Sequence, residues 1–197
     1  MKRSLSILFA VIVACLFISC GTTVEVVDTK HDSSSAVAGM EYRDFHYAAD
    51  NMVASMIDSG CLERKEGGRY VVTISRIKND TSQYIDTDQL VKKIRIYLLR
   101  SGKATVTTAV GGSGSEDAMS REVRQLGADA TFNQATVAGQ GTMVAPDLSL
   151  SGKILERQIS GGGRRVQIEY YFQLTLTDIH TGLAIWEDEQ LVVKRVK

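Results

Sequence analysis

Few residues of this chain combine the side-chain types and the spacing that catalysis requires. The three histidines, His31, His46 and His180, lie far apart, and no pair has the spacing of a metal-binding motif such as H-E-x-x-H. Cys61 follows a glycine at an expected helix end, without a recognisable nucleophile signature around it. Ser113 lies between two glycines, but a G-x-S-x-G turn also needs a preceding buried strand and a downstream acid and histidine. We therefore expect no catalytic site, no metal and no cofactor.

Two charged clusters also lack a catalytic arrangement, and one of them could bind a partner. Glu187, Asp188 and Glu189 belong to an expected outer strand, where they are typical of a solvated face rather than of a calcium loop. Arg164 and Arg165 follow three glycines at the expected tip of a hairpin. A basic pair in that position can meet an acidic partner or a glycan carboxylate, although a soluble turn is the simpler interpretation.

The start of the chain contains the residue with the clearest covalent chemistry, Cys20. Lys2 and Arg3 precede an apolar run over residues 4–18. At about 1.5 Å of rise per residue this run spans only about 22 Å of a ~30 Å hydrocarbon core, as in an export signal peptide. It ends in L-F-I-S-C-G, residues 16–21, which resembles the lipobox of bacterial lipoproteins. The resemblance implies that the cysteine thiol accepts diacylglycerol and that the leader is cut just before it.

We expect residues 1–19 to be removed and Cys20 to carry the lipid. Cys15 also fits the pattern, but its use would leave an exposed apolar stub over residues 16–18. An uncleaved membrane anchor is the other alternative. Two or three acyl chains hold a protein stably on a bilayer. Gly21 stands where aspartate would favour the inner membrane, so the resemblance implies an outer-membrane protein that faces the periplasm.

Residues 20–41 are expected to form a flexible tether because they are mostly small and polar, with three consecutive serines. A tether of about 20 residues spans about 25 Å when flexible and at most ~70 Å when extended. Residues 42–197 then form one domain. The 23 Lys and Arg residues balance the 23 Asp and Glu residues, which argues against a nucleic-acid partner.

Apolar periodicity within the domain predicts helices first and strands later. The helical stripes run from Phe45 to Ile57, where Gly60 ends the helix, and from Asp86 or Thr87 to Gly102. The remaining expected elements are a strand over 70–77 that is broken at 79–81, a strand over 104–108, a helix over 115–126, a short strand over 130–132, a hairpin of 148–159 with 166–179, and a last strand over 184–193. The pattern predicts an α/β or α+β fold with a single mixed, mainly antiparallel β-sheet flanked by helices.

Four sequence blocks in this pattern resemble the penicillin-binding protein activator LpoB family. They are V-V-T-I-S-R-I-K-N-D-T at 71–81 with I-D-T at 85–87, L-G-A-D at 126–129, A-P-D-L-S-L-S-G-K-I at 145–154, and Y-Y-F-Q-L-T-L-T-D at 170–178 with T-G at 181–182 and I-W-E at 185–187. The resemblance covers about residues 42–194. It implies a non-catalytic outer-membrane lipoprotein that binds and activates a bifunctional peptidoglycan synthase, a class A penicillin-binding protein, and so supports cell-wall synthesis.

The tether departs from the family pattern because well-known members have a long proline-rich linker. A tether this short limits how far the domain can reach toward a synthase in the inner membrane. An alternative is a structural or secretion-associated envelope lipoprotein of a related CsgG-like fold, although the 148–179 hairpin is too charged for an evident lipid face. For the contact surface we expect Asn79, Asp80 and Thr81 together with Arg164 and Arg165, since exposed loops on rigid scaffolds often carry binding.

Overall fold

A computed structural model describes residues 37, 39–111, 117–160 and 166–196 of the chain. Several of the residues singled out in the sequence lie outside this part: Cys15, Cys20, His31, Ser113, Arg164 and Arg165.

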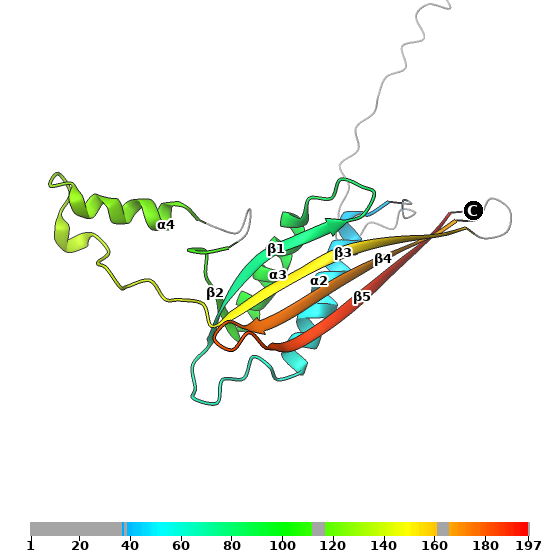
Figure 1. Cartoon of the computed structure of the whole chain (residues 1–197), viewed down its shortest axis with the longest axis horizontal. Helices are drawn as coiled ribbons and strands as arrows, with labels where there is room; N and C mark the ends of the chain where they lie inside the picture. Colours follow the sequence, from blue (N-terminus) through cyan, green and yellow to red (C-terminus); the bar gives the residue numbers. More distant parts are fainter. Residues whose placement is uncertain (1–36, 38, 112–116, 161–165, 197) are drawn as a thin grey trace, which may run out of the picture. The chain divides into compact units, whose positions relative to one another are not determined.

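The described chain folds around one five-stranded sheet with the strand order β2-β1-β3-β4-β5. Neighbours β2, β1 and β3 run parallel, whereas the much longer ladders of β3 with β4 and of β4 with β5 are antiparallel (Figure 1). The predicted mixed, mainly antiparallel sheet with flanking helices is confirmed. The elements are α2 (Tyr42–Asp58), β1 (Tyr70–Asp80), α3 (Thr87–Ser101), β2 (Ala104–Val106), α4 (Met119–Glu122), the 3-10 helices η1 (Val123–Ala128) and η2 (Gln134–Thr136), β3 (Leu148–Ser160), β4 (Val166–Asp178) and β5 (Ala184–Val196).

The two long helices begin and end where local sequence signals place them. Asp86 caps α3 by accepting a hydrogen bond from the Asp88 backbone N–H at 3.0 Å. Gly102 ends α3 in the left-handed conformation, with φ of 69°. At the start of α2, the side chains of Glu41 and Asp44 form a reciprocal capping box.

The hydrophobic core lies between the sheet and these two helices, which lie behind the strands in Figure 1. Phe45 of α2 meets Phe172 of β4 edge-on, with ring centroids 6.1 Å apart. Fully burying a large apolar side chain contributes about 1.5–3 kcal/mol, so this layer is the main source of stability. The predicted stripes of α2 and α3 supply its helical half: Phe45, Ala48, Ala49, Met52, Val53, Met56, Leu90, Val91, Ile94 and Leu98 are all buried.

Gly152 of β3 lies where the backbone of β4 comes very close. A Cβ atom at this position would collide with the backbone carbonyl oxygen of Gln173 and would lie 2.6 Å from Cδ2 of Leu174. Opposite the same stretch, β1 has an irregularity between Ile74 and Ile77. The glycine of the 145–154 block therefore has a packing role.

Besides small shifts in strand ends, the structure differs from the prediction in three places. β1 is not broken at Asn79 but continues to Asp80, because its last residues still pair with β3. The short strand over 130–132 was wrong: the Asp129 side chain accepts hydrogen bonds from the backbone N–H and hydroxyl of Thr131, which turns the chain. In the described part of the expected 115–126 helix, only Met119–Glu122 is α-helical, and a 3-10 helix follows.

Candidate functional site

The sheet presents one face that no helix covers over β3, β4 and β5 within the described part of the chain. Strand alternation assigns side chains to it: Tyr170 and Phe172 of β4 are buried beneath the helices, so Tyr171 between them points to the opposite side. We call this side of β1, β3, β4 and β5, turned away from α2 and α3, the open face.

A row of apolar side chains crosses the centre of the open face. Leu155, Tyr171 and Leu191 are in register on β3, β4 and β5, and we call them the apolar row. Leu155 and Tyr171 are half-buried, whereas Leu191 is 40% exposed. Val193, the next residue of β5 on this side, is 42% exposed. Apolar side chains in one continuous row form a contact patch rather than scattered surface residues.

Tyr171 is held in place by neighbours on its own strand. Its hydroxyl donates to Glu169 Oε2 at 2.5 Å, and Gln167 Nε2 donates to Glu169 Oε1 at 2.7 Å. These hydrogen bonds lower the pKa of Glu169, so the carboxylate stays ionised, and the bond from Tyr171 to Glu169 raises the pKa of Tyr171. Arg157, opposite Glu169 on β3, adds a favourable charge. The ring is therefore fixed before any partner arrives.

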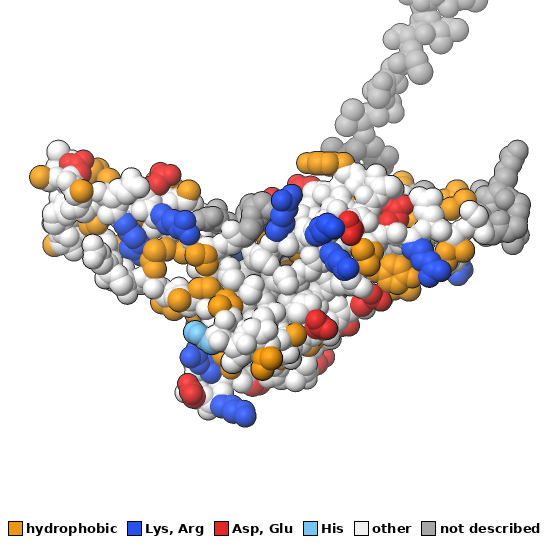
Figure 2. Space-filling model, viewed as in Figure 1, with side chains coloured by type: hydrophobic (Ala, Val, Ile, Leu, Met, Phe, Trp, Pro, Cys, Tyr) orange, Lys and Arg blue, Asp and Glu red, His pale blue; other side chains and the backbone are white. Residues whose placement is uncertain are grey.

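Charge is divided across the open face. Lys78 of β1 and Lys153 of β3 are side by side, and Arg157 lies further along β3; all three are exposed, and we call them the basic flank. Asp80 pairs with Lys78 at 3.0 Å. On β5, at the opposite edge of the open face from β1, Glu187 and Glu189 accept hydrogen bonds from Thr175 and Gln173 of β4. Glu189 is in the same cross-strand row as Lys78 and Lys153. Figure 2, seen from this side, shows basic, apolar and acidic side chains exposed together.

The predicted contact residues Asn79, Asp80 and Thr81 lie at the end of β1, beside the open face. Asn79 Nδ2 donates to the carbonyl of Gln83 at 2.8 Å, and its Oδ1 accepts from the Thr81 hydroxyl at 2.8 Å. Ser82 is tied to Glu156 of β3 through its N–H and its hydroxyl. The polar groups of Asn79 and Thr81 therefore shape a turn, whereas Asp80 is in register with Leu155 of the apolar row.

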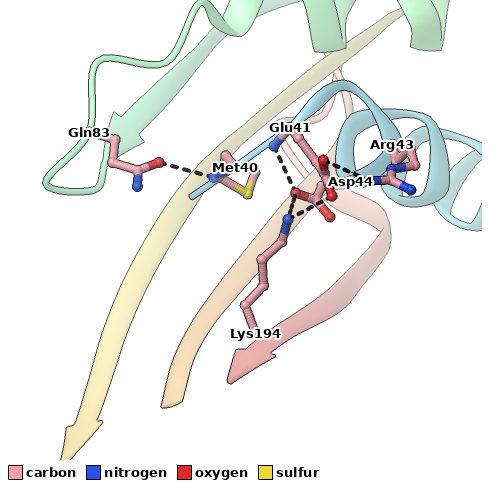
Figure 3. Close-up of polar contacts among 6 residues, drawn as sticks. All are labelled: Met40, Glu41, Arg43, Asp44, Gln83 and Lys194. Atoms are coloured by element: carbon pink, nitrogen blue, oxygen red, sulfur yellow. Dashed lines mark hydrogen bonds and ion pairs between the residues drawn. The ribbon is translucent and has the colours of Figure 1, made fainter. Parts of the chain in front are cut away.

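The start of α2 is joined to the last strand by a buried cluster of charged side chains (Figure 3). We call Glu41, Arg43, Asp44 and Lys194 the ion cluster. Lys194 of β5 is 7% exposed, and its Nζ lies 2.7 Å from Asp44 Oδ2 and 3.1 Å from Glu41 Oε1. Burial by itself would raise the pKa of Glu41, but hydrogen bonds and charge from Lys194 and Arg43 hold that pKa below its ordinary value. Next to it, the Met40 backbone N–H donates to Gln83 Oε1 at 3.1 Å. Residues 40–44 are thus fastened to two parts of the domain that are distant in sequence, the loop at Gln83 and the end of β5.

His46, His180 and Cys61, which were considered for catalysis, lie in contacts or turns that belong to the fold. His46 Nδ1 lies 3.4 Å from the hydroxyl of Tyr97, and His180 is in the turn after β4. Burial raises the pKa of the Cys61 thiol, whose sulfur donates to the carbonyl of Met56, so the unreactive protonated form is favoured. Among the described residues no group of three or more His, Cys, Asp or Glu could hold a metal, and no helix is long and apolar enough to cross a membrane.

Sequence reasoning missed the apolar row and the basic flank as a site. The signal was the alternation of residue types along β4, where Gln167, Glu169 and Tyr171 alternate with Ile168, Tyr170 and Phe172. Its meaning depends on which face the helices cover, and the sequence pattern does not specify that.

Comparison with known proteins gives one strong match. The family model for the peptidoglycan-synthase activator LpoB matches residues 44–192. A search of curated proteins finds no match. Among solved structures, the chain is similar to the LpoB C-terminal domain from Salmonella enterica, with 16% identity, coverage of 76% of this chain and 98% of that one, and a TM-score of 0.42. The LpoB C-terminal domain from Escherichia coli is 16% identical, with coverage of 77% of this chain and 99% of that one and a TM-score of 0.43. Lipoprotein GNA1162 from Neisseria meningitidis is 10% identical, with coverage of 64% of this chain and 83% of that one and a TM-score of 0.37.

Proposed function

The chain belongs to the LpoB family of peptidoglycan-synthase activators, and from this premise we propose that it binds and activates a class A penicillin-binding protein. The family is one of regulatory activators rather than of enzymes. In this proposal the domain performs no chemistry of its own and supports cell-wall synthesis through its partner.

The observation that carries the proposal is the extent of the family match. Residues 44–192 include both long helices and nearly the whole sheet, from α2 into β5. The open face adds a physical basis for a binding role, since it exposes apolar and charged side chains on a rigid sheet. Activation then needs only a higher affinity for the active conformation of the synthase than for the inactive one. A tenfold preference corresponds to about 1.4 kcal/mol, which a few contacts can provide.

We further propose that lipid on Cys20 anchors the protein in the outer membrane, where it faces the periplasm. The tether makes this anchor a constraint, because about 20 residues extend at most ~70 Å. The partner must therefore lie within reach of the domain at the end of this tether. Replacement of Cys20 by alanine should abolish incorporation of labelled palmitate and release the protein from the membrane fraction. Unchanged labelling of the Cys20→Ala variant would refute the anchor site without affecting the activator proposal.

Partner capture tests the activator proposal. The full-length chain with a C-terminal affinity tag is produced in its own bacterium and recovered from detergent-solubilised membranes after brief crosslinking. A class A penicillin-binding protein should be enriched over a sample from cells with an unrelated tagged lipoprotein. If no synthase is enriched, and the purified synthase also fails to bind the purified chain, the proposal is wrong.

A further inference from the structure

We propose that the open face is the surface on which the synthase docks, and that it receives a protein surface with an apolar centre and a carboxylate rim. This inference rests on the proposed function, because it names the contact surface for the same partner. It places the apolar row at the centre of the interface and the basic flank against the carboxylate rim of the partner.

The apolar row has the composition and the rigidity of an interface centre. Tyrosine and arginine are enriched among the residues that dominate binding energy, and here Tyr171 lies across from Leu155, with Arg157 nearby on the same strand as Leu155. The hydrogen bond from Tyr171 to Glu169 already fixes the ring, so docking costs little side-chain entropy. The long antiparallel ladders of β3, β4 and β5 hold these side chains in register as one continuous row.

The charges indicate the chemistry of the partner. Lys78 and Lys153 are neighbours on adjacent strands and repel one another, and Asp80 offsets only part of that repulsion through its pair with Lys78. Lys153 has no ion-pair partner among the described residues. Carboxylates on a docking protein would complement both lysines. The glutamates of β5 are already hydrogen-bonded within the sheet, so the basic flank offers the stronger electrostatic attraction.

The helical side of the domain differs from the open face. Each long helix exposes one large apolar side chain, Tyr47 of α2 and Leu99 of α3, on otherwise polar surface. Single exposed apolar residues of this kind are normal on a soluble domain. They supply matched controls for substitutions on the open face.

The test compares two pairs of exposed residues. Leu191→Asp and Lys153→Glu alter the open face, and Leu99→Asp and Lys92→Glu make the same changes on α3, where Lys92 is also exposed. Each full-length variant is purified in detergent, checked for an unchanged thermal unfolding temperature, and titrated against the purified synthase on a biosensor. We expect each open-face variant to weaken binding by about tenfold or more, and each α3 variant to change it by less than about twofold.

The outcomes separate this inference from the proposed function. If the unsubstituted chain does not bind the synthase, the proposed function fails. If it binds and the α3 variants weaken binding while the open-face variants do not, the docking surface is wrong and the function stands.

Two other occupants of the open face would also overturn the inference. One is a second copy of this chain, shown by a dimer in sedimentation that Leu191→Asp dissociates while the affinity for the synthase stays unchanged. The other is the chain's own segment 117–146. It would be identified by faster proteolysis of that segment in Leu191→Asp, again with unchanged affinity for the synthase.

Discussion

Replacing Lys194 by methionine tests how strongly the buried ion cluster fastens the start of the domain to β5. The methylene stem is largely retained, but the cation is lost, which leaves the carboxylates of Glu41 and Asp44 buried without it. These side chains are only 14% and 9% exposed, so water cannot replace the ammonium group. Breaking a buried pair by removing one partner typically costs 3–5 kcal/mol, and we expect about 3 kcal/mol because Arg43 still reaches Glu41 at 3.1 Å.

Equilibrium unfolding measures this loss. With a urea slope of about 2 kcal/mol per molar, a loss of about 3 kcal/mol moves the midpoint down by about 1.5 M. For a domain of this size it also lowers the melting temperature by about 6–12 °C. The matched control is Lys78→Met, which breaks the exposed pair with Asp80 and should cost less than about 1 kcal/mol. If Lys194→Met costs no more than Lys78→Met, the ion cluster does not fasten the domain and the reasoning is refuted.

Three further substitutions have defined outcomes. Gly152→Ala should destabilise the domain by about 3 kcal/mol in urea unfolding, because its Cβ would collide with the backbone of Gln173; a loss below about 1 kcal/mol would show that β3 and β4 can separate easily. The depressed pKa of Glu41 contributes stability that is present above its ordinary value of 4.5 and is lost as the pH falls through the lower folded value. Glu41→Gln should therefore flatten the fall in unfolding free energy below pH 4.5, and an unchanged slope would contradict this. Tyr170→Phe should leave stability unchanged or raise it by up to about 1 kcal/mol, since the buried Tyr170 hydroxyl has no hydrogen-bond partner among the residues that the structure describes; a clear loss would reveal one.

The parts of the fold that depend on local signals could be predicted from the sequence. α3 is specified by the Asp86 cap, the apolar stripe and Gly102, all within one short segment. The hairpin of β3 and β4 follows from two β-branched and aromatic runs on either side of three consecutive glycines. The prediction of a strand around Phe132 failed because the side chain of Asp129 stabilises a turn there. This local hydrogen bond outweighs the strand propensity of only three residues.

Features that depend on distant partners could not be predicted. The charge of Lys194 is typical of an exposed strand end, but the residue is buried because Glu41 lies opposite it from 153 positions earlier in the chain. The close approach at Gly152 requires knowledge of the β4 backbone. The expected contact at Asn79 and Thr81 remains a prediction, although their hydrogen bonds within the turn leave them fewer polar groups for a partner.

The rate of glycan polymerisation tests the central claim most directly. A purified class A penicillin-binding protein from the same bacterium is supplied with a fluorescent lipid-linked disaccharide precursor, with and without the purified full-length chain. We expect a saturable increase in rate, and the Leu191→Asp variant should need about tenfold more protein for the same increase. If the synthase polymerises normally by itself and its rate is unchanged at a saturating concentration of this protein, the claim that the protein is an activator is contradicted.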